Sequence, residues 1–230
     1  MPGHASRSSP IPLWGKVGHD LRQPIQSLLL LAHVMAKTVD GAQRAETGRV
    51  MENALMALQE MLDAVALVAR LEAGAEPIRT DRCDLAVVVA QAALRFKASN
   101  GGVPIAVKPA RAEAVADRRL LEKALLGLLH YALASQADGE TITLGCRVAT
   151  GVGRIEVAFA GAPQTSAAQA ALFIELGGGG AAGGHTIMGL PLIERMVVAA
   201  GGRMEHRSAR GGRQLHAIVF DGAATDNHDT

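Results

Sequence analysis

The sequence predicts an α+β protein: an N-terminal antiparallel helical hairpin that pairs with a second copy in a four-helix bundle, followed by an α/β sandwich. Residues 13–39 and 43–73 carry apolar side chains in rows spaced seven apart, the pattern of long helices packed along a stripe. Asp40-Gly41 between them is a turn signal. Beyond Pro77, helical segments alternate with mainly antiparallel strands, which predicts a sandwich.

The composition excludes several classes of protein. The 230 residues include 23 basic and 22 acidic side chains, so nothing indicates nucleic-acid binding. No apolar run approaches the ~18 residues that a membrane span needs, and the N-terminus lacks a secretion signal. Cys83 and Cys146 lie far apart without metal-site spacing, which is typical of buried thiols in a reducing compartment. We therefore expect a soluble, cytoplasmic protein with no bound metal.

The first predicted helix presents a row of polar side chains beside its apolar stripe. Residues 1–12 precede it and contain three Pro and three Ser, which predicts a disordered leader. Within the helix, His19, Gln26 and His33 are spaced seven apart and fall off the apolar rows. We therefore expect His19 to face solvent, and we interpret His33 as an ordinary surface histidine.

The second predicted helix, residues 43–73, has an apolar face too wide for one partner helix to cover. Its main rows are Met51/Leu58/Val65 and Ala54/Met61/Val68. Pairing two hairpins in a four-helix bundle buries such a face, so the pattern predicts a homodimer. Gly74 ends the helix, and residues 13–75 form the first predicted domain.

The second predicted domain covers residues 84–220, between a linker at 76–83 and a frayed tail at 221–230. Asp84 and Asp117 each precede an apolar helical pattern and are expected to cap it. Helices are predicted at 84–97, 117–135 and 189–200. Strands are predicted at 105–108, 114–116, 141–148, 154–159, 203–208 and 214–220, and a glycine-rich loop at 177–184.

The segment Gly18-His19-Asp20-Leu21-Arg22-Gln23-Pro24 groups an imidazole, an acid, a guanidinium and a proline within roughly one and a half helical turns. A neutral imidazole nitrogen is nucleophilic at pH 7, and an adjacent carboxylate can hold the other ring nitrogen in its N–H form. Pro24 has no N–H, so the carbonyl of Asp20 loses its helical partner. This segment resembles the H-box of two-component histidine kinases, whose histidine is phosphorylated. Residues 62–74 resemble the end of the second dimerisation helix of that family.

The resemblance implies that His19 carries a phosphoryl group. Asp20 would orient the imidazole or accept its proton, and Arg22 would pair with a phosphoryl oxygen or a receiver carboxylate. Gln23 would hold a water molecule for dephosphorylation, or serve as a plain surface residue. The implied partners are response-regulator receiver domains.

We expect a receiver domain to dock beside this segment, because the attacking and leaving atoms of phosphoryl transfer must lie in line. The residues expected to meet it are Gln26, Leu29 and Leu30.

Residues 84–220 resemble the ATP-binding domain of histidine kinases, most clearly over 189–205 and on to Gly211-Gly212-Arg213. The resemblance fails at the nucleotide contacts. Gly127 and Tyr131 stand where the family has asparagines that hold Mg²⁺, and Phe159 stands where an aspartate reads the adenine amine. Mg²⁺ prefers oxygen ligands in tight octahedral geometry, which glycine does not provide. The pair Ile187-Met188 likewise replaces the first Gly-Leu of a repeated family motif.

These departures favour a histidine phosphotransferase, which moves a phosphoryl group between receiver aspartates through His19 and needs no cofactor. One alternative is an autophosphorylating histidine kinase core, alone or cut from a longer sensor, that uses ATP and Mg²⁺. In that case Gly184 and Gly189 are the expected nucleotide contacts, since glycine-rich loops before a helix bind phosphates. The other alternative is a non-enzymatic scaffold that docks receivers.

Overall fold

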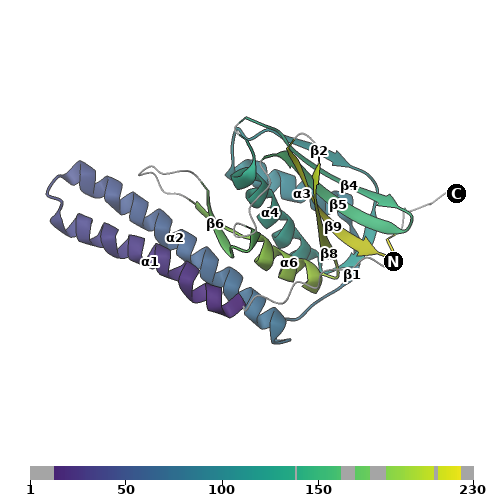
Figure 1. The fold of residues 1–230 in the computed structure, drawn as a ribbon, viewed down its shortest axis with the longest axis horizontal. Coiled ribbons are helices and arrows are strands. Elements are labelled where there is room, and N and C mark those ends of the chain that lie inside the picture. Colours follow the sequence, from purple (N-terminus) through teal and green to yellow (C-terminus); the bar gives the residue numbers. More distant parts are fainter. Residues whose placement is uncertain (1–12, 138, 162–168, 177–184, 210–211, 224–230) are drawn as a thin grey trace, which may run out of the picture.

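A computed structural model describes residues 13–137, 139–161, 169–176, 185–209 and 212–223 (Figure 1). The predicted leader, most of the predicted tail and the predicted nucleotide contact Gly184 lie outside these residues. Within them, no helix is both long enough and apolar enough to cross a membrane.

The N-terminal hairpin consists of α1 (Leu13–Lys37) and α2 (Gly41–Glu72). Asp40 caps α2, since its Oδ1 accepts hydrogen bonds from the backbone N–H groups of Ala42 at 2.7 Å and Gln43 at 3.1 Å. The helix α1 continues through Pro24. Figure 1 shows the closed end of the hairpin projecting away from the second domain. The predicted pair of long helices is confirmed.

The second domain is built around a five-stranded sheet in the order β2-β4-β5-β9-β8. The strands β2 and β4 are parallel and the other neighbours are antiparallel. Figure 1 shows α3, α4 and α6 on one face of this sheet, which confirms the predicted α+β class with an α/β sandwich. The elements are β1 (Asp81–Asp84), α3 (Leu85–Ser99), β2 (Ile105–Pro109), β3 (Glu113–Ala116), α4 (Arg118–Ser135), β4 (Ile142–Ala149), β5 (Val152–Ala160), β6 (Phe173–Leu176), β7 (His185–Met188), α6 (Leu190–Ala199), β8 (Arg203–Ala209) and β9 (Arg213–Asp221).

Two short strand pairs depart from the expected pattern. The strand β1 begins inside the stretch 76–83 that the sequence assigns to a linker, and it pairs antiparallel with β3. The strands β6 and β7, which flank the glycine-rich segment, pair with each other and were not predicted. Strands of four residues have little periodicity of their own, and their pairing depends on tertiary context.

The turn between β4 and β5 was predicted at 151–153, but β5 already begins at Val152. The turn instead uses Thr150 and Gly151, which have φ angles of 51° and 74°. Two consecutive positive φ angles match the right-handed twist of a tight hairpin. The sequence hides this turn because a β-branched residue rarely adopts a positive φ.

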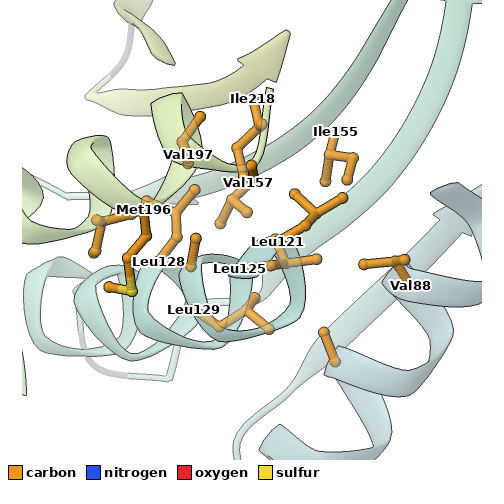
Figure 2. Close-up of a cluster of buried hydrophobic side chains, with 14 of the residues drawn as sticks. Val88, Leu121, Leu125, Leu128, Leu129, Ile155, Val157, Met196, Val197 and Ile218 are labelled. Atoms are coloured by element: carbon orange, nitrogen blue, oxygen red, sulfur yellow. The ribbon is translucent and has the colours of Figure 1, made fainter. Parts of the chain in front are cut away.

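The main core lies between the sheet and its helices (Figure 2). Side chains from α3, α4, β5, α6 and β9 interdigitate there, and the labelled set consists of Val88, Leu121, Leu125, Leu128, Leu129, Ile155, Val157, Met196, Val197 and Ile218. Cys83 and Cys146 are buried free thiols, as predicted, and burial raises the pKa of both.

The same core extends into the hairpin. Ala64, Leu67 and Val68 of α2 are at most 3% exposed and belong to the buried cluster of the second domain. The helix α2 contacts β7 and α6 in this region. The C-terminal half of α2 is therefore shared between the two domains.

Ion pairs link the C-terminal end of α2 to helices of the second domain. Arg195 of α6 pairs with Glu72, the last residue of α2. Glu76 accepts from Arg70 Nε at 2.8 Å and lies 2.8 Å from Arg119 Nη2, so it bridges α2 and α4. These contacts, with the Arg70 hydrogen bond first, lower the pKa of Glu76.

Candidate functional site

His19 lies near the N-terminus of α1, and its side chain is 81% exposed. Its Nδ1 lies 3.1 Å from Oδ1 of Asp20. A carboxylate only accepts hydrogen bonds, so Nδ1 carries the hydrogen and Nε2 carries the lone pair. The neighbouring acid thus reaches the imidazole and sets its tautomer, although adjacent helix residues do not usually face each other.

Arg22 and Gln23 are also exposed on α1, three and four positions beyond His19. Residues at these spacings share one helix face, so both side chains accompany His19 on the same surface. Within the described residues, no carboxylate lies within ion-pair distance of Arg22. A guanidinium beside an unblocked imidazole can pair with an incoming phosphate or carboxylate.

Apolar side chains next to this surface remain exposed in the single chain. Ile25 is 44% exposed, Leu29 67% and Leu30 64% on α1. On α2, Leu55 and Met56 are 48% and 56% exposed. Two helices of one hairpin therefore leave a wide apolar surface uncovered, as the heptad rows indicate.

Phe159 and Tyr131, two of the substituted nucleotide positions, are fully buried in a cluster of aromatic rings. Phe159 of β5 stacks on His216 of β9 with 5.7 Å between ring centroids and an angle of 3° between planes. Tyr131 of α4 meets the same imidazole edge-on at 5.5 Å. Burial, with a smaller contribution from His206, lowers the pKa of His216 to about 4.

Gly127, the other substituted position, lies where α4 is closely packed. A Cβ there would come within 2.9 Å of Met188 Cε and 3.3 Å of Ile193 Cγ1. Met188 of β7 and Ile193 of α6 therefore occupy the space beside α4. Ile187 and Met188, which replace the glycine-containing family motif, belong to β7; Ile187 is buried and Met188 packs against the core.

Gly189 caps α6 through its backbone. Its N–H donates to the carbonyl of Leu172 at 2.7 Å, and a Cβ would come within 1.9 Å of Ala171 O. This close approach of two backbones explains the glycine without a nucleotide.

A cavity of about 450 Å³ lies between α2 and the second domain, beside Gly127. Its walls come from α2, α3, α4, β6 and β7, so no local sequence pattern marks it. Its lining residues are Glu60, Met61, Asp63, Ala64, Ser99, Asn100, Lys123, Leu126, Gly127, His130, Phe173, Ile187 and Met188. Across the described ranges, no three His, Cys, Asp or Glu side chains gather as a metal site.

The fold is that of a histidine kinase core. No family model matches the chain, and neither does any curated protein. Among solved structures, the chain is similar to the Acinetobacter baumannii histidine kinase AdeS, with a TM-score of 0.70 and 15% identity over 89% of this chain and 98% of that one.

Two further structures show the same arrangement. One is the histidine kinase ThkA in complex with the response regulator TrrA, with a TM-score of 0.68 and 13% identity over 91% of this chain and 61% of that one. The other is full-length ShkA in complex with AMPPNP, with a TM-score of 0.57 and 20% identity over 95% of this chain and 47% of that one. At these identities the likeness shows the fold, and function must be argued from the residues.

Proposed function

We propose that this protein is a histidine phosphotransferase of a two-component phosphorelay, which moves a phosphoryl group between receiver-domain aspartates through His19. The observation that carries the proposal is the imidazole itself. It is 81% exposed, and its Nδ1 is held by Asp20 at 3.1 Å, so Nε2 is left as the outward nucleophile. The fold of a histidine kinase core supports the same conclusion.

In the proposed reaction, His19 Nε2 attacks the phosphorus of an aspartyl phosphate on a receiver. The N–P bond forms as the bond to the aspartyl oxygen breaks, and the electron pair leaves with that carboxylate. Asp20 stabilises the positive charge that develops on the imidazole, because Nδ1–H donates to it. In the second transfer, a carboxylate of another receiver attacks phosphorus and expels the neutral imidazole.

Both transfers need mainly positioning, since aspartyl phosphate and phosphohistidine are both high-energy species. Arg22 shares the helix face of His19 and would pair with a phosphoryl oxygen or a receiver carboxylate. Gln23, on the same face, would hold the water molecule that hydrolyses the phosphohistidine.

The docking surface for receivers would lie next to His19, at Gln26, Leu29 and Leu30, all of which are exposed. ThkA, a histidine kinase of this fold, forms a complex with a response regulator. We extend that pairing to this chain as part of the proposal.

The proposed active form is a homodimer in the cytoplasm. Exposed apolar side chains on both hairpin helices, including Ile25, Leu55 and Met56, would be covered by a second hairpin in a four-helix bundle. Size-exclusion chromatography with light scattering tests this directly: the expected mass is twice the 23.9 kDa of one chain.

The second domain is proposed to work without ATP or Mg²⁺. Phe159, at the position that the family resemblance assigns to the adenine contact, is fully buried and stacked on His216. Gly127 provides no oxygen ligand, and Met188 packs against it.

One observation favours the alternative, an autophosphorylating kinase. The 450 Å³ cavity beside Gly127 is large enough for a small ligand, and the structurally similar protein ShkA binds AMPPNP in its crystal structure. ATP and Mg²⁺ would then be required, and Gly184 and Gly189 would be their expected contacts.

Radiolabelling separates these functions. The purified chain is incubated either with γ-labelled ATP and Mg²⁺ or with a receiver domain that was phosphorylated beforehand and freed of nucleotide. We expect label on the chain only from the phosphorylated receiver. Label from ATP alone would establish the kinase and overturn the proposal, and no label from either source would leave a docking scaffold.

A further inference from the structure

An open groove of about 520 Å³ runs between α3 and α4, apart from the His19 surface and the aromatic cluster. Four of its side chains are cationic, one is acidic and one is apolar. They are Arg95, Arg118, Arg119, Lys123, Glu122 and Leu126.

A single glutamate fixes two of the arginines. Glu122 accepts from Arg118 Nε at 2.8 Å with one carboxylate oxygen, and the other oxygen lies 3.2 Å from Arg95 Nη1. The Glu122 side chain is only 13% exposed. Arg118 also donates from Nη2 to Gln91 at 2.7 Å. A guanidinium has five N–H donors, so each of these positioned arginines retains donors for a ligand.

The third arginine, Arg119, forms its ion pair with a residue of the domain junction. Arg119 Nη2 lies 2.8 Å from Glu76, whose other carboxylate oxygen accepts from Arg70. Lys123 completes the groove, and no carboxylate in the described part of the chain lies within ion-pair distance of it. Lys123 therefore has no ion-pair partner among the described residues, and Arg119 is paired with Glu76 of the domain junction.

The groove concentrates positive charge in a nearly neutral protein. Glu76 also pairs with Arg70, and the charge of Asp84 acts on Arg118. Five cations therefore face the three carboxylates Glu122, Glu76 and Asp84, so two positive charges are left over, whereas the whole chain has a net charge of +1. Arg118 and Arg119 occupy the first turn of α4, where the helix dipole repels cations. The sequence maintains this charge at a cost to helix stability.

We infer that the groove binds a small polyanion that presents two or more adjacent phosphate groups. Fixed planar guanidinium groups match phosphate oxygens in a forked geometry, and two excess positive charges suit a ligand with more charge than a single carboxylate. Its volume of about 520 Å³ leaves room for more than one phosphate group. None of the residues that carry the proposed phosphotransfer takes part.

The ligand competes with Glu76 for Arg119. When phosphate oxygens accept the Arg119 N–H groups, Glu76 retains only Arg70, and the bridge between α2 and α4 is released. Binding at the groove thereby loosens one of the contacts between the hairpin that carries His19 and the second domain, beside the Arg195–Glu72 ion pair and the shared core. Binding of the anion at the groove is thereby coupled to the contact between α2 and α4 at the domain junction.

Isothermal titration calorimetry of the full chain with sodium tripolyphosphate, in buffer containing EDTA, tests the inference. We expect one site per chain. The double variant Arg95→Gln/Lys123→Gln should weaken binding about tenfold, because two charge-assisted contacts are lost. Glu76→Gln should tighten binding about threefold, because Arg119 no longer has a competing carboxylate.

The matched control removes two exposed cations elsewhere, Arg44→Gln/Arg207→Gln, and should change the affinity less than about twofold. Equal weakening by both double variants would mean diffuse charge attraction and would overturn the site. So would weaker binding in Glu76→Gln, or the absence of saturable binding. Citrate and orthophosphate serve as comparison ligands, and citrate binding as tightly as tripolyphosphate would overturn the assignment to phosphates.

Discussion

The His19 surface and the aromatic cluster of the second domain differ in solvent exposure and in whether their polar groups can reach a partner. At His19, the imidazole is exposed, its Nδ1 is bonded to Asp20, and its other nitrogen is unobstructed. In the aromatic cluster, Phe159 and Tyr131 are fully buried, and the imidazole of His216 stacks on Phe159 and meets Tyr131 edge-on. One region keeps chemical groups available, whereas the other uses its groups for packing. The comparison shows that positions which the family resemblance assigns to nucleotide contacts can hold core side chains within the same fold.

The largest expected effect is the loss of phosphoryl acceptance in His19→Ala. In the proposed mechanism this imidazole is the nucleophile and no other group on α1 replaces it, so label from a phosphorylated receiver should fall to background. The exposed position of His19 predicts that circular dichroism and chain mass are unchanged. His33→Ala, on the same helix and also exposed, is the matched control and should accept label normally.

Phe159→Ala should destabilise the protein by about 3–5 kcal/mol, because it leaves a cavity in a fully buried ring cluster. Urea unfolding measures this loss. In the kinase alternative Phe159 borders a working nucleotide site, and its truncation would change ATP affinity more than stability. An unchanged urea midpoint would contradict the role of Phe159 in packing.

Acid should destabilise the second domain through His216, whose folded pKa is about 4. The unfolded imidazole titrates near 6.5, so below that pH the unfolded state binds more protons than the folded state. Stability therefore falls as the pH drops from about 6.5 to 4, by up to roughly 3 kcal/mol. Urea unfolding across this range should show the slope, and His216→Phe should flatten it. An equal slope in the variant would assign the effect to other groups.

Asp20→Asn has the smallest expected effect, about a tenfold slower transfer to His19. The amide presents no negative charge to the imidazole, so the tautomer and the developing cation are less well stabilised. Rapid-quench kinetics with a phosphorylated receiver measures the rate. Asp63→Asn, an exposed acid on α2, is the control and should leave the rate unchanged.

Local sequence patterns predicted the long helices and most strands, because heptad rows, capping aspartates and strand alternation act over short distances. Asp84 and Asp117 cap the helices they were expected to cap, and Asp40, expected only as part of a turn, caps α2. The exposure of His19 follows from its place off the apolar rows. The burial of Phe159 could also be expected, because the resemblance places a polar binding residue at this position and an apolar ring there favours packing.

The features that the sequence did not reveal depend on residues far apart in the chain. The stacking of His216 on Phe159 joins two strands, and the bridge through Glu76 joins α2 to α4. The cavity beside Gly127 takes its walls from five elements. Gly189, expected to contact a nucleotide only in the kinase alternative, lies so close to the backbone of Ala171 that a Cβ would not fit, which no local pattern indicates.

The central claim is that His19 relays a phosphoryl group between two receivers. The direct measurement mixes a labelled phospho-receiver, the purified chain and a second, unlabelled receiver, in the absence of ATP. The account predicts that label reaches the second receiver only when the chain is present, and that His19→Ala blocks this transfer while His33→Ala does not. Transfer that persists in His19→Ala would contradict the account.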